Sequence, residues 1–397
     1  MLEKRITILF LFLLLTGAVL VLVLPADQQS AVKENRALAQ LPEFSKATVF
    51  SGEFASGFEK YLSDNVGFRS RLTDLSAKLE ASSGLKTSFG NIFSVNKDIG
   101  TGTTQKSGLL VLQDRIMEVF YQNRESQQAY IDALNRISKT TEGRAAVYSM
   151  LIPTRLSFEA PLYANIQNNQ QASIHSIYDS LDPAVLTVDA YSALENHAQE
   201  YIYFRTDHHW TALGAYYGYE AFCSAAGLPP IPLAQFEQNT IPGLWGGLAN
   251  QVPQDLLPKE PDQLTWYQVD PAGQLQLQMQ GPNQEGELTF YEGTLFDFER
   301  APQYSFFLSG DHPFAEITNP NLAEGKTLLL VKDSYGNALL PWLTQNYHKI
   351  IMIDPRTYWG SLEDLFSTYP IDDCLIADYI FATSFPDYCA LLDGLAG

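Results

Sequence analysis

The sequence predicts an α/β fold in which a parallel sheet is flanked by helices, carries a partly β insertion and follows an N-terminal transmembrane helix. One observation is a set of near-continuous apolar runs, which are typical of strands buried on both faces of a parallel sheet. Another is that helical patterns separate these runs, as parallel crossover connections require. A third is the Pro-, Gly- and Gln-rich composition of residues 231–320, which interrupts this alternation. The apolar runs cover residues 145–152, 327–332, 349–353 and 375–381.

The first 25 residues predict a short cytoplasmic stub and a membrane anchor. An uncharged apolar run from Ile6 to Leu24 follows Lys4 and Arg5. As a helix, a run of this length spans about 28 Å, close to the thickness of a bilayer's hydrocarbon core. The positive charges before it predict a cytoplasmic N-terminus and a body outside the membrane. A cleaved signal peptide is the alternative, although no clear cleavage motif follows the run.

The remaining chain predicts a tether over 26–50 and a single body over 51–397, with the insertion at about 231–320. The insertion contains three short alternating segments that predict strands, and its loops could shape a substrate cleft. These segments are 264–268, 274–279 and 304–308. Before the insertion, the periodicity predicts helices near 54–82, 127–137, 171–180, 191–200 and 211–226, and short strands within 90–112 and at 185–188.

The composition limits the classes of partner. Asp and Glu total 45 against 25 Lys and Arg, which gives a formal net charge of -20. This charge repels phosphate backbones, so nucleic acid is not an expected partner, whereas neutral substrates remain open. The aromatic content of 12% fits an aromatic-rich core or a sugar-binding cleft. Cys223, Cys374 and Cys389 lack zinc-binding spacing, and are either three buried thiols or include a bridge between the last two.

One segment, Arg205–Thr211, concentrates side chains suited to catalysis. Asp207, His208 and His209 are consecutive and directly precede a predicted helix, which Thr211 could cap. A histidine can act as a general base, and a neighbouring carboxylate can hold its tautomer. The structural alternative is a capped helix start with partly exposed histidines. The same three side chains could also ligate a metal.

A second segment ends the apolar run at 327–332. Ser334 follows this strand, and a helical pattern comes next. Such a strand–turn–helix can expose a nucleophilic serine at the carboxyl end of a sheet, where the first helical amides can stabilise an oxyanion. Ser334 as a helix cap is the alternative. Because a serine hydroxyl needs a base, we expect His209 to take its proton and Asp207 to orient His209.

Two motifs, Arg205-Thr-Asp-His-His-Trp210 and Lys332-Asp-Ser-Tyr-Gly-Asn337, resemble the DHHW family of bacterial exported proteins. That family is similar to the SGNH-hydrolase-like domains of alginate O-acetylation proteins. The resemblance implies an SGNH-hydrolase-like fold, with Asp207 as the acidic member, His209 as the base and Ser334 as the nucleophile. By the same resemblance, His208 occupies the variable position between the Asp and the His of the family motif. Three further segments agree with the resemblance, namely Glu34–Arg36, Asp64–Arg69 and Asp354–Arg356.

The sequence departs from ordinary SGNH enzymes around the nucleophile. Lys332 stands where a glycine is usual, and the usual oxyanion-binding segments are not obvious. We therefore expect other residues to bind the oxyanion or the substrate. The candidates are Gly246, Gly247, Asn337, Arg356, Tyr358 and His208. A tight turn is the alternative for the two glycines, and an ion pair is the alternative for Arg356.

The anchor, the three-residue site and the resemblance together imply an enzyme of the cell envelope. The implied reaction is serine-dependent transfer of an O-acyl group, by resemblance acetyl, to an envelope polysaccharide, or its hydrolysis from one. The expected protein is single-pass with an extracytoplasmic C-terminal domain and needs no cofactor or metal, and a membrane-bound acyltransferase could supply the acyl group. The alternatives are a non-catalytic envelope or assembly protein on the same scaffold, and a metal-dependent phosphoesterase. The sequence offers no second Asp or His cluster to complete the two-metal site that such a phosphoesterase would need.

Overall fold

The computed structural model describes residues 91–159, 169–282 and 287–397, together with scattered positions between 40 and 61. The predicted anchor over 1–25 lies outside the described residues, as do most of the tether and most of the predicted helix near 54–82. The division of the first 50 residues therefore stays a prediction. Within the described ranges, none of the helices combines the length and apolar character that a membrane span requires.

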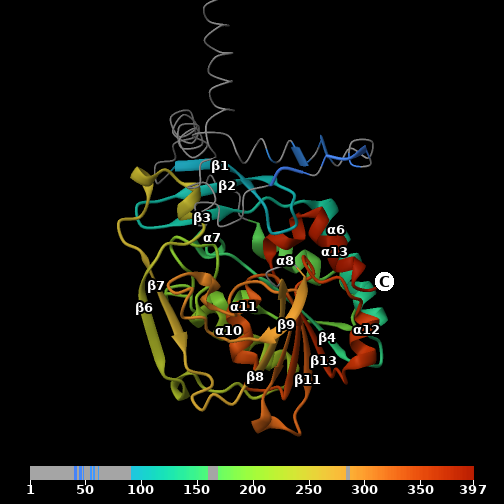
Figure 1. Ribbon diagram of the computed structural model, residues 1–397. Coiled ribbons are helices and arrows are strands. Elements are labelled where there is room, and N and C mark those ends of the chain that lie inside the picture. Colours follow the sequence, from blue (N-terminus) through green and yellow to red (C-terminus); the bar gives the residue numbers. More distant parts are fainter. Residues whose placement is uncertain are drawn as a thin grey trace, which may run out of the picture.

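An eight-stranded sheet with the order β5-β4-β13-β11-β12-β10-β8-β9 forms the centre of the molecule (Figure 1). The first five strands of this order, namely β5, β4, β13, β11 and β12, run parallel to one another. The other three strands continue the sheet in antiparallel fashion. The bounds are β5 (Val185–Thr187), β4 (Ala146–Ile152), β13 (Asp373–Tyr379), β11 (Thr327–Lys332), β12 (Lys349–Ile353), β10 (Phe314–Thr318), β8 (Gln276–Pro282) and β9 (Leu288–Glu292).

The five parallel strands agree with the predicted α/β fold, whereas the insertion is not separate from the sheet, because the segment 231–320 supplies β8, β9 and β10 to it. The strands predicted at 264–268 and 274–279 are present as β7 (Asp262–Tyr267) and β8. β7 pairs with β6 (Gln238–Leu244) in a separate two-stranded sheet. The strand predicted at 304–308 is wrong, since Tyr304–Phe306 forms a 3₁₀ turn. Tyr304, Phe306 and Phe307 are all buried, which an alternating strand would not allow.

Helices cover both faces of the sheet, as the alternation predicted. On one face α6 packs against α8, α12 and α13, and on the other α10 packs against α9 and α11 (Figure 1). The first group comprises α6 (Arg124–Thr140), α8 (Gln170–Tyr178), α12 (Leu362–Thr368) and α13 (Pro386–Gly394). The second comprises α9 (Ala190–Glu195), α10 (Ala212–Ala226) and α11 (Gly336–Leu343), and the short α7 (Leu156–Glu159) follows β4.

The N-terminal part of the described body forms its own small antiparallel sheet. It consists of β1 (Asn91–Lys97), β2 (Gln105–Val111) and β3 (Ile116–Val119), in that order. The first two strands confirm the prediction for residues 90–112. Cys223, Cys374 and Cys389 are free and buried in this structure.

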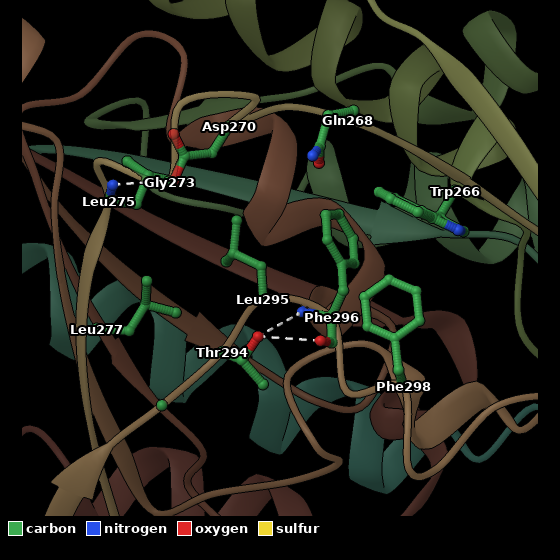
Figure 2. Close-up of a pocket in the computed structure, with 11 residues that line it drawn as sticks. Trp266, Gln268, Asp270, Gly273, Leu275, Leu277, Thr294, Leu295, Phe296 and Phe298 are labelled. Atoms are coloured by element: carbon green, nitrogen blue, oxygen red, sulfur yellow. Dashed lines mark hydrogen bonds between the residues drawn. The ribbon is translucent and has the colours of Figure 1, made fainter.

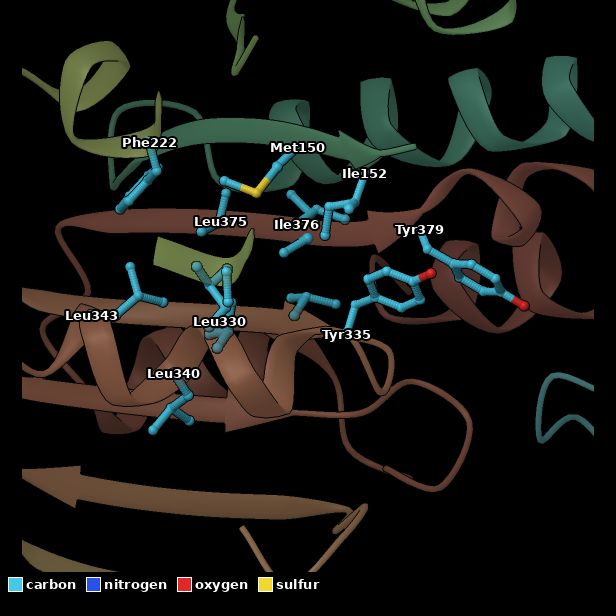
Figure 3. Packing of buried hydrophobic residues seen from close by; sticks show 14 of the residues in the cluster. Met150, Ile152, Phe222, Leu330, Tyr335, Leu340, Leu343, Leu375, Ile376 and Tyr379 are labelled. Atoms are coloured by element: carbon cyan, nitrogen blue, oxygen red, sulfur yellow. The ribbon is translucent and has the colours of Figure 1, made fainter. Parts of the chain in front are cut away.

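The core lies between the central strands and the helices, and it ends beside the candidate site. Leu330 of β11, Leu375 of β13 and Met150 of β4 are fully buried between these layers (Figure 3). Burying each such side chain contributes about 1.5–3 kcal/mol. At the carboxyl ends of β11 and β13 the aliphatic packing gives way to Tyr335 and Tyr379, whose rings stack with centroids 5.0 Å apart. Carboxyl ends of parallel strands meet at one edge of a sheet, and this edge carries Ser334.

Candidate active site

Ser334 lies in the turn between β11 and α11, and Asp333 holds that turn in place. The Asp333 carboxylate accepts hydrogen bonds from the backbone amides of Tyr335 and Tyr379, both at 2.8 Å. Burial raises the pKa of Asp333 to about 6, although Arg356 and the two amides oppose this shift. A Cβ on Gly336 would lie 2.5 Å from Cβ of the fully buried Lys332, so only glycine permits this tight approach. The turn leaves Ser334 half-buried.

The structure brings Asp207, His209 and Ser334 into one hydrogen-bonded line. His209 Nδ1 lies 2.6 Å from Asp207 Oδ1, and His209 Nε2 lies 2.7 Å from Ser334 Oγ. Asp207 and His209 are both buried. Burial opposes the charged form of Asp207, yet the charge and hydrogen bond of His209 outweigh it and hold the Asp207 pKa below its usual range. Both distances are those of a nucleophile, a base and an orienting carboxylate in contact.

The tryptophan of the motif ties this segment to the turn that carries Ser334. Trp210 is fully buried, and its indole Nε1 donates to the carbonyl oxygen of Tyr335 at 3.0 Å. Glycines at 214 and 218 let α10 approach it, because a Cβ on Gly218 would lie 2.8 Å from the indole ring. Thr211 caps α10 by accepting from the amide of Gly214 at 3.3 Å, as the sequence predicted. The sequence interpretation had given Trp210 no such role.

A buried carboxylate from the insertion anchors the residues before Asp207. Asp262, at the start of β7, is fully buried. Its side chain accepts from the amides of Arg205 and Thr206 at 2.8 Å each. It also accepts from the Thr206 hydroxyl at 2.5 Å. Since Thr206 directly precedes Asp207, these bonds fix the position from which the Asp207 side chain starts.

Gly246 and Gly247 have a different role from the predicted one. The Gly246 amide donates to Thr206 Oγ1 at 2.9 Å, and the Gly247 amide donates to Asp207 Oδ2 at 2.8 Å. A Cβ on Gly246 would lie 2.3 Å from Cβ of Asp207. Because both amides already have acceptors, the expectation that they bind an oxyanion is corrected. The glycines wrap around Asp207 and orient it.

His208 lies beside the base rather than in the hydrogen-bonded line. Its ring packs on that of His209 with centroids 3.8 Å apart, and its Nδ1 lies 3.7 Å from Asp207 Oδ1. Its side chain retains 26% exposure. Burial and the nearby charges of His209 and Lys97 lower the pKa of His208 well below its usual value. His208 therefore lies at the rim of the site, outside the hydrogen-bonded line.

Asn337 belongs to a polar network beneath the turn and does not face an oxyanion. Its Oδ1 accepts from Lys332 Nζ at 2.6 Å, and its Nδ2 donates to Asp311 Oδ1 at 2.9 Å. Lys332 Nζ also donates to Asp311 Oδ1 at 3.1 Å. These partners occupy the Asn337 side chain on both sides. The atypical Lys332 therefore reaches under the turn and ties it to the insertion through Asp311.

Arg356 forms ion pairs with Asp311 and Asp354, which was the alternative to substrate binding. Its Nε donates to Asp354 Oδ1 and its Nη2 to Asp311 Oδ2, both at 2.8 Å. Its Nη1 donates to the carbonyl oxygen of Ile99, also at 2.8 Å. These contacts use its donors for structure, so we no longer assign substrate binding to Arg356. Tyr358 is half-buried and packs on Phe314 with ring centroids 6.4 Å apart.

Tyr304 is a site residue that the sequence interpretation missed. Its ring stacks on His209 with centroids 3.6 Å apart and an angle of 5° between the planes. Its hydroxyl donates to the carbonyl oxygen of Ser334 at 3.0 Å. It lay within a run that predicted a strand, and the signal available was the aromatic density of residues 304–307. One side chain thus contacts both the base and the residue that carries the hydroxyl.

Asp207, His208 and His209 also form a possible metal-ligand group, with one ligand atom of each lying within 4.8 Å of the others. However, both ring nitrogens of His209 already contact Asp207 and Ser334. The two oxygens of Asp207 accept from His209 and Gly247. A metal would have to replace these contacts, so the residues present fit a hydrogen-bonded line better than a metal centre.

A cavity of about 250 Å³ lies in the insertion (Figure 2). Its wall includes Trp266, Phe296 and Phe298, and no residue of the hydrogen-bonded line contributes to it. Ring contacts connect it to the site, because Phe296 packs on Phe307 at 6.2 Å and Phe307 packs on Tyr304 at 5.5 Å. The cavity therefore adjoins the aromatic support of His209 without containing the reacting groups.

Comparison with protein families matches residues 88–353 to the family described as DHHW protein. Among solved structures, a DHHW family protein from Eubacterium siraeum is 27% identical, with a TM-score of 0.63, over 75% of this chain and 96% of that one. PatB1 of Bacillus cereus is 20% identical, with a TM-score of 0.60, over 70% of this chain and 99% of that one. The O-acetyltransferase domain of Pseudomonas putida AlgJ is 16% identical, with a TM-score of 0.43, over 72% of this chain and 99% of that one. No curated protein matches the chain. The family match covers more than half of the chain and confirms the resemblance carried by the two motifs, so the protein belongs to the DHHW family.

Proposed function

We propose that this protein is a serine-dependent acyltransferase or esterase that moves an O-acyl group to or from a hydroxyl of a cell-envelope polysaccharide. The observation that carries the proposal is the hydrogen-bonded line from Asp207 through His209 to Ser334, with contacts of 2.6 and 2.7 Å. The acyl group that we propose is acetyl, on the basis of the sequence resemblance to alginate O-acetylation proteins. The proposed setting is the outer side of a membrane, with the apolar run from Ile6 to Leu24 as anchor.

In the proposed reaction, Ser334 Oγ attacks the acyl carbon while His209 Nε2 takes the hydroxyl proton. Asp207 holds the proton on Nδ1 of His209 and stabilises the imidazolium. Collapse of the tetrahedral intermediate expels the donor oxygen, which takes the proton from His209. An acceptor hydroxyl, or water, then loses its proton to His209 and attacks the acyl–Ser334 ester. The second collapse returns the proton to Ser334 Oγ, so the residues are regenerated.

The oxyanion donor that we propose is the backbone amide of Ser334. Within the described ranges this amide makes no hydrogen bond, whereas the next amide, of Tyr335, already donates to Asp333. A preorganised amide beside the reacting carbon stabilises the charge that develops on the acyl oxygen. This proposal replaces Gly246 and Gly247 in that role.

The test is hydrolysis of p-nitrophenyl acetate by the purified full-length protein. Ser334→Ala and His209→Ala should each lower kcat/KM by at least about 100-fold, the usual contribution of a nucleophile or general base. Ser176→Ala and His175→Ala on the exposed face of α8 are the matched controls and should retain the rate. No turnover of acetyl esters by the wild type, or equal rates in all variants, would favour a non-catalytic envelope protein.

A further inference from the structure

The tryptophans divide into two sets with different exposure. Trp210, Trp266 and Trp342 are at most 9% exposed. Trp245 is 42% exposed, and Trp359 is 88% exposed. Covering so large an apolar ring with a ligand or partner would recover hydrophobic free energy that its exposure to water forgoes.

Both exposed tryptophans lie in loops that build the candidate site. Trp245 directly precedes Gly246 and Gly247, whose amides hold Thr206 and Asp207. Trp359 follows Arg356 in the loop after β12. The ends of β11 and β12 are neighbours, because Val331 pairs with Ile353. The loops that carry the two tryptophans therefore lie at the same edge of the sheet as Ser334.

The loop that carries Trp359 has a rigid base. Tyr358 packs on Phe314 at 6.4 Å, and Phe314 meets Phe290 edge-on at 5.7 Å. The Arg356 side chain is fixed by Asp354 and Asp311. A ring presented from an ordered loop loses little conformational entropy when a ligand stacks on it. The loop from which Trp359 projects is therefore held in place before a ligand arrives.

Charge restricts the ligand that could stack there. The chain carries a formal net charge of -20, and the two cations that meet Asp311, Lys332 and Arg356, are both paired with carboxylates. Neither Lys332 nor Arg356 is therefore free to neutralise a polyanion. The negative net charge of the chain also repels a polyanion. The apolar C–H face of a sugar ring suits an aromatic face without needing any charge.

We propose that Trp245 and Trp359 are stacking platforms for the sugar rings of an uncharged acceptor glycan. The assignment rests on the proposed function, which supplies the reason for a glycan at this edge, and it adds the residues that hold the glycan and its charge class. A polyuronate or another polyanionic polysaccharide is excluded as the acceptor.

The test measures glycan binding without turnover, by isothermal titration of the full-length Ser334→Ala protein with cellohexaose, chitohexaose and a hexauronate. Trp245→Ala and Trp359→Ala, made in this background, should each weaken binding of an uncharged hexasaccharide by about tenfold, and Trp359→Phe by much less. Tyr121→Ala is the control, since Tyr121 is 56% exposed and lies outside these loops. Melting temperatures report folding of each variant.

Binding of an uncharged hexasaccharide that falls in both alanine variants and persists in Tyr121→Ala supports the proposal. Binding of the hexauronate in preference to the uncharged sugars overturns it, as does unchanged affinity in both tryptophan variants or absence of all glycan binding. The titration does not depend on catalysis, so a failure of the proposed acyl transfer would appear separately in the ester assay.

Discussion

Replacing Gly246 by alanine should disable the site while leaving the fold in place. The new Cβ would lie 2.3 Å from Cβ and 2.6 Å from Cα of Asp207, a backbone position that cannot rotate away. Ordinary contacts begin near 3.4 Å, so one of the two segments must shift by about 1 Å. A displacement of about 1 Å in catalytic geometry can cost about 100-fold in rate. The overpacking should also lower the free energy of unfolding by about 1–3 kcal/mol.

The neighbouring glycine provides the matched control. A Cβ on Gly247 would meet only Asp207 Oδ2, at 3.8 Å, and the amide that donates to Asp207 is kept. Gly247→Ala should therefore lose less than about threefold in rate. The assay is kcat/KM for p-nitrophenyl acetate, with thermal melting to show that both variants fold. A wild-type rate in Gly246→Ala, or an equal loss in both variants, would refute the assigned role of this loop.

Three further predictions concern the surroundings of the base and the turn. Tyr304→Leu should lower kcat/KM about 10- to 30-fold, because the stack of Tyr304 on His209 and its hydrogen bond to Ser334 are worth about 1 kcal/mol each. Tyr304→Phe keeps the ring and should lower kcat/KM by less. Equal losses of kcat/KM in the two variants would argue against a role for the stack. Burial raises the pKa of Asp333 from 3.8 to about 6, so the folded wild type holds a proton that the unfolded chain releases, and its stability should fall as pH rises through this window. The side chain of Asp333→Asn cannot titrate, so the melting temperature of this variant relative to wild type should rise from pH 4 to 6. A melting-temperature difference that stays constant over this range would count against the raised pKa of Asp333. Dialysis against EDTA should leave ester hydrolysis unchanged, whereas a loss restored by zinc or manganese would favour the metal alternative at Asp207, His208 and His209.

The regular elements were predictable from the sequence because their signals are local. The apolar runs at 327–332 and 349–353 coincide with β11 and β12, since strands buried on both faces need apolar side chains throughout. The addition of β8 to β10 to the same sheet was not predictable, because strand alternation does not specify which edge a strand joins. The 304–308 run misled for a related reason, as aromatic clustering and strand alternation give similar local patterns.

The three residues of the hydrogen-bonded line were predictable from the sequence, and the residues that support them were not. Consecutive Asp and His side chains and a serine after a buried strand are local patterns that suggested Asp207, His209 and Ser334 directly. The glycines, Asn337 and Arg356 were assigned by residue type, and the structure gives their polar atoms other partners. Tyr304 and Trp210 act through contacts with residues far along the chain, and a single sequence does not show which residues those partners are.

The proposed function depends above all on Ser334 being a nucleophile that His209 activates. Incubation of the purified full-length protein with phenylmethylsulfonyl fluoride, followed by peptide mass spectrometry, tests it most directly. We expect one sulfonyl adduct on Ser334, none in Ser334→Ala, and adduct formation slowed by at least about 100-fold in His209→Ala. An unlabelled protein, a label on another residue, or an unchanged rate in His209→Ala would contradict it.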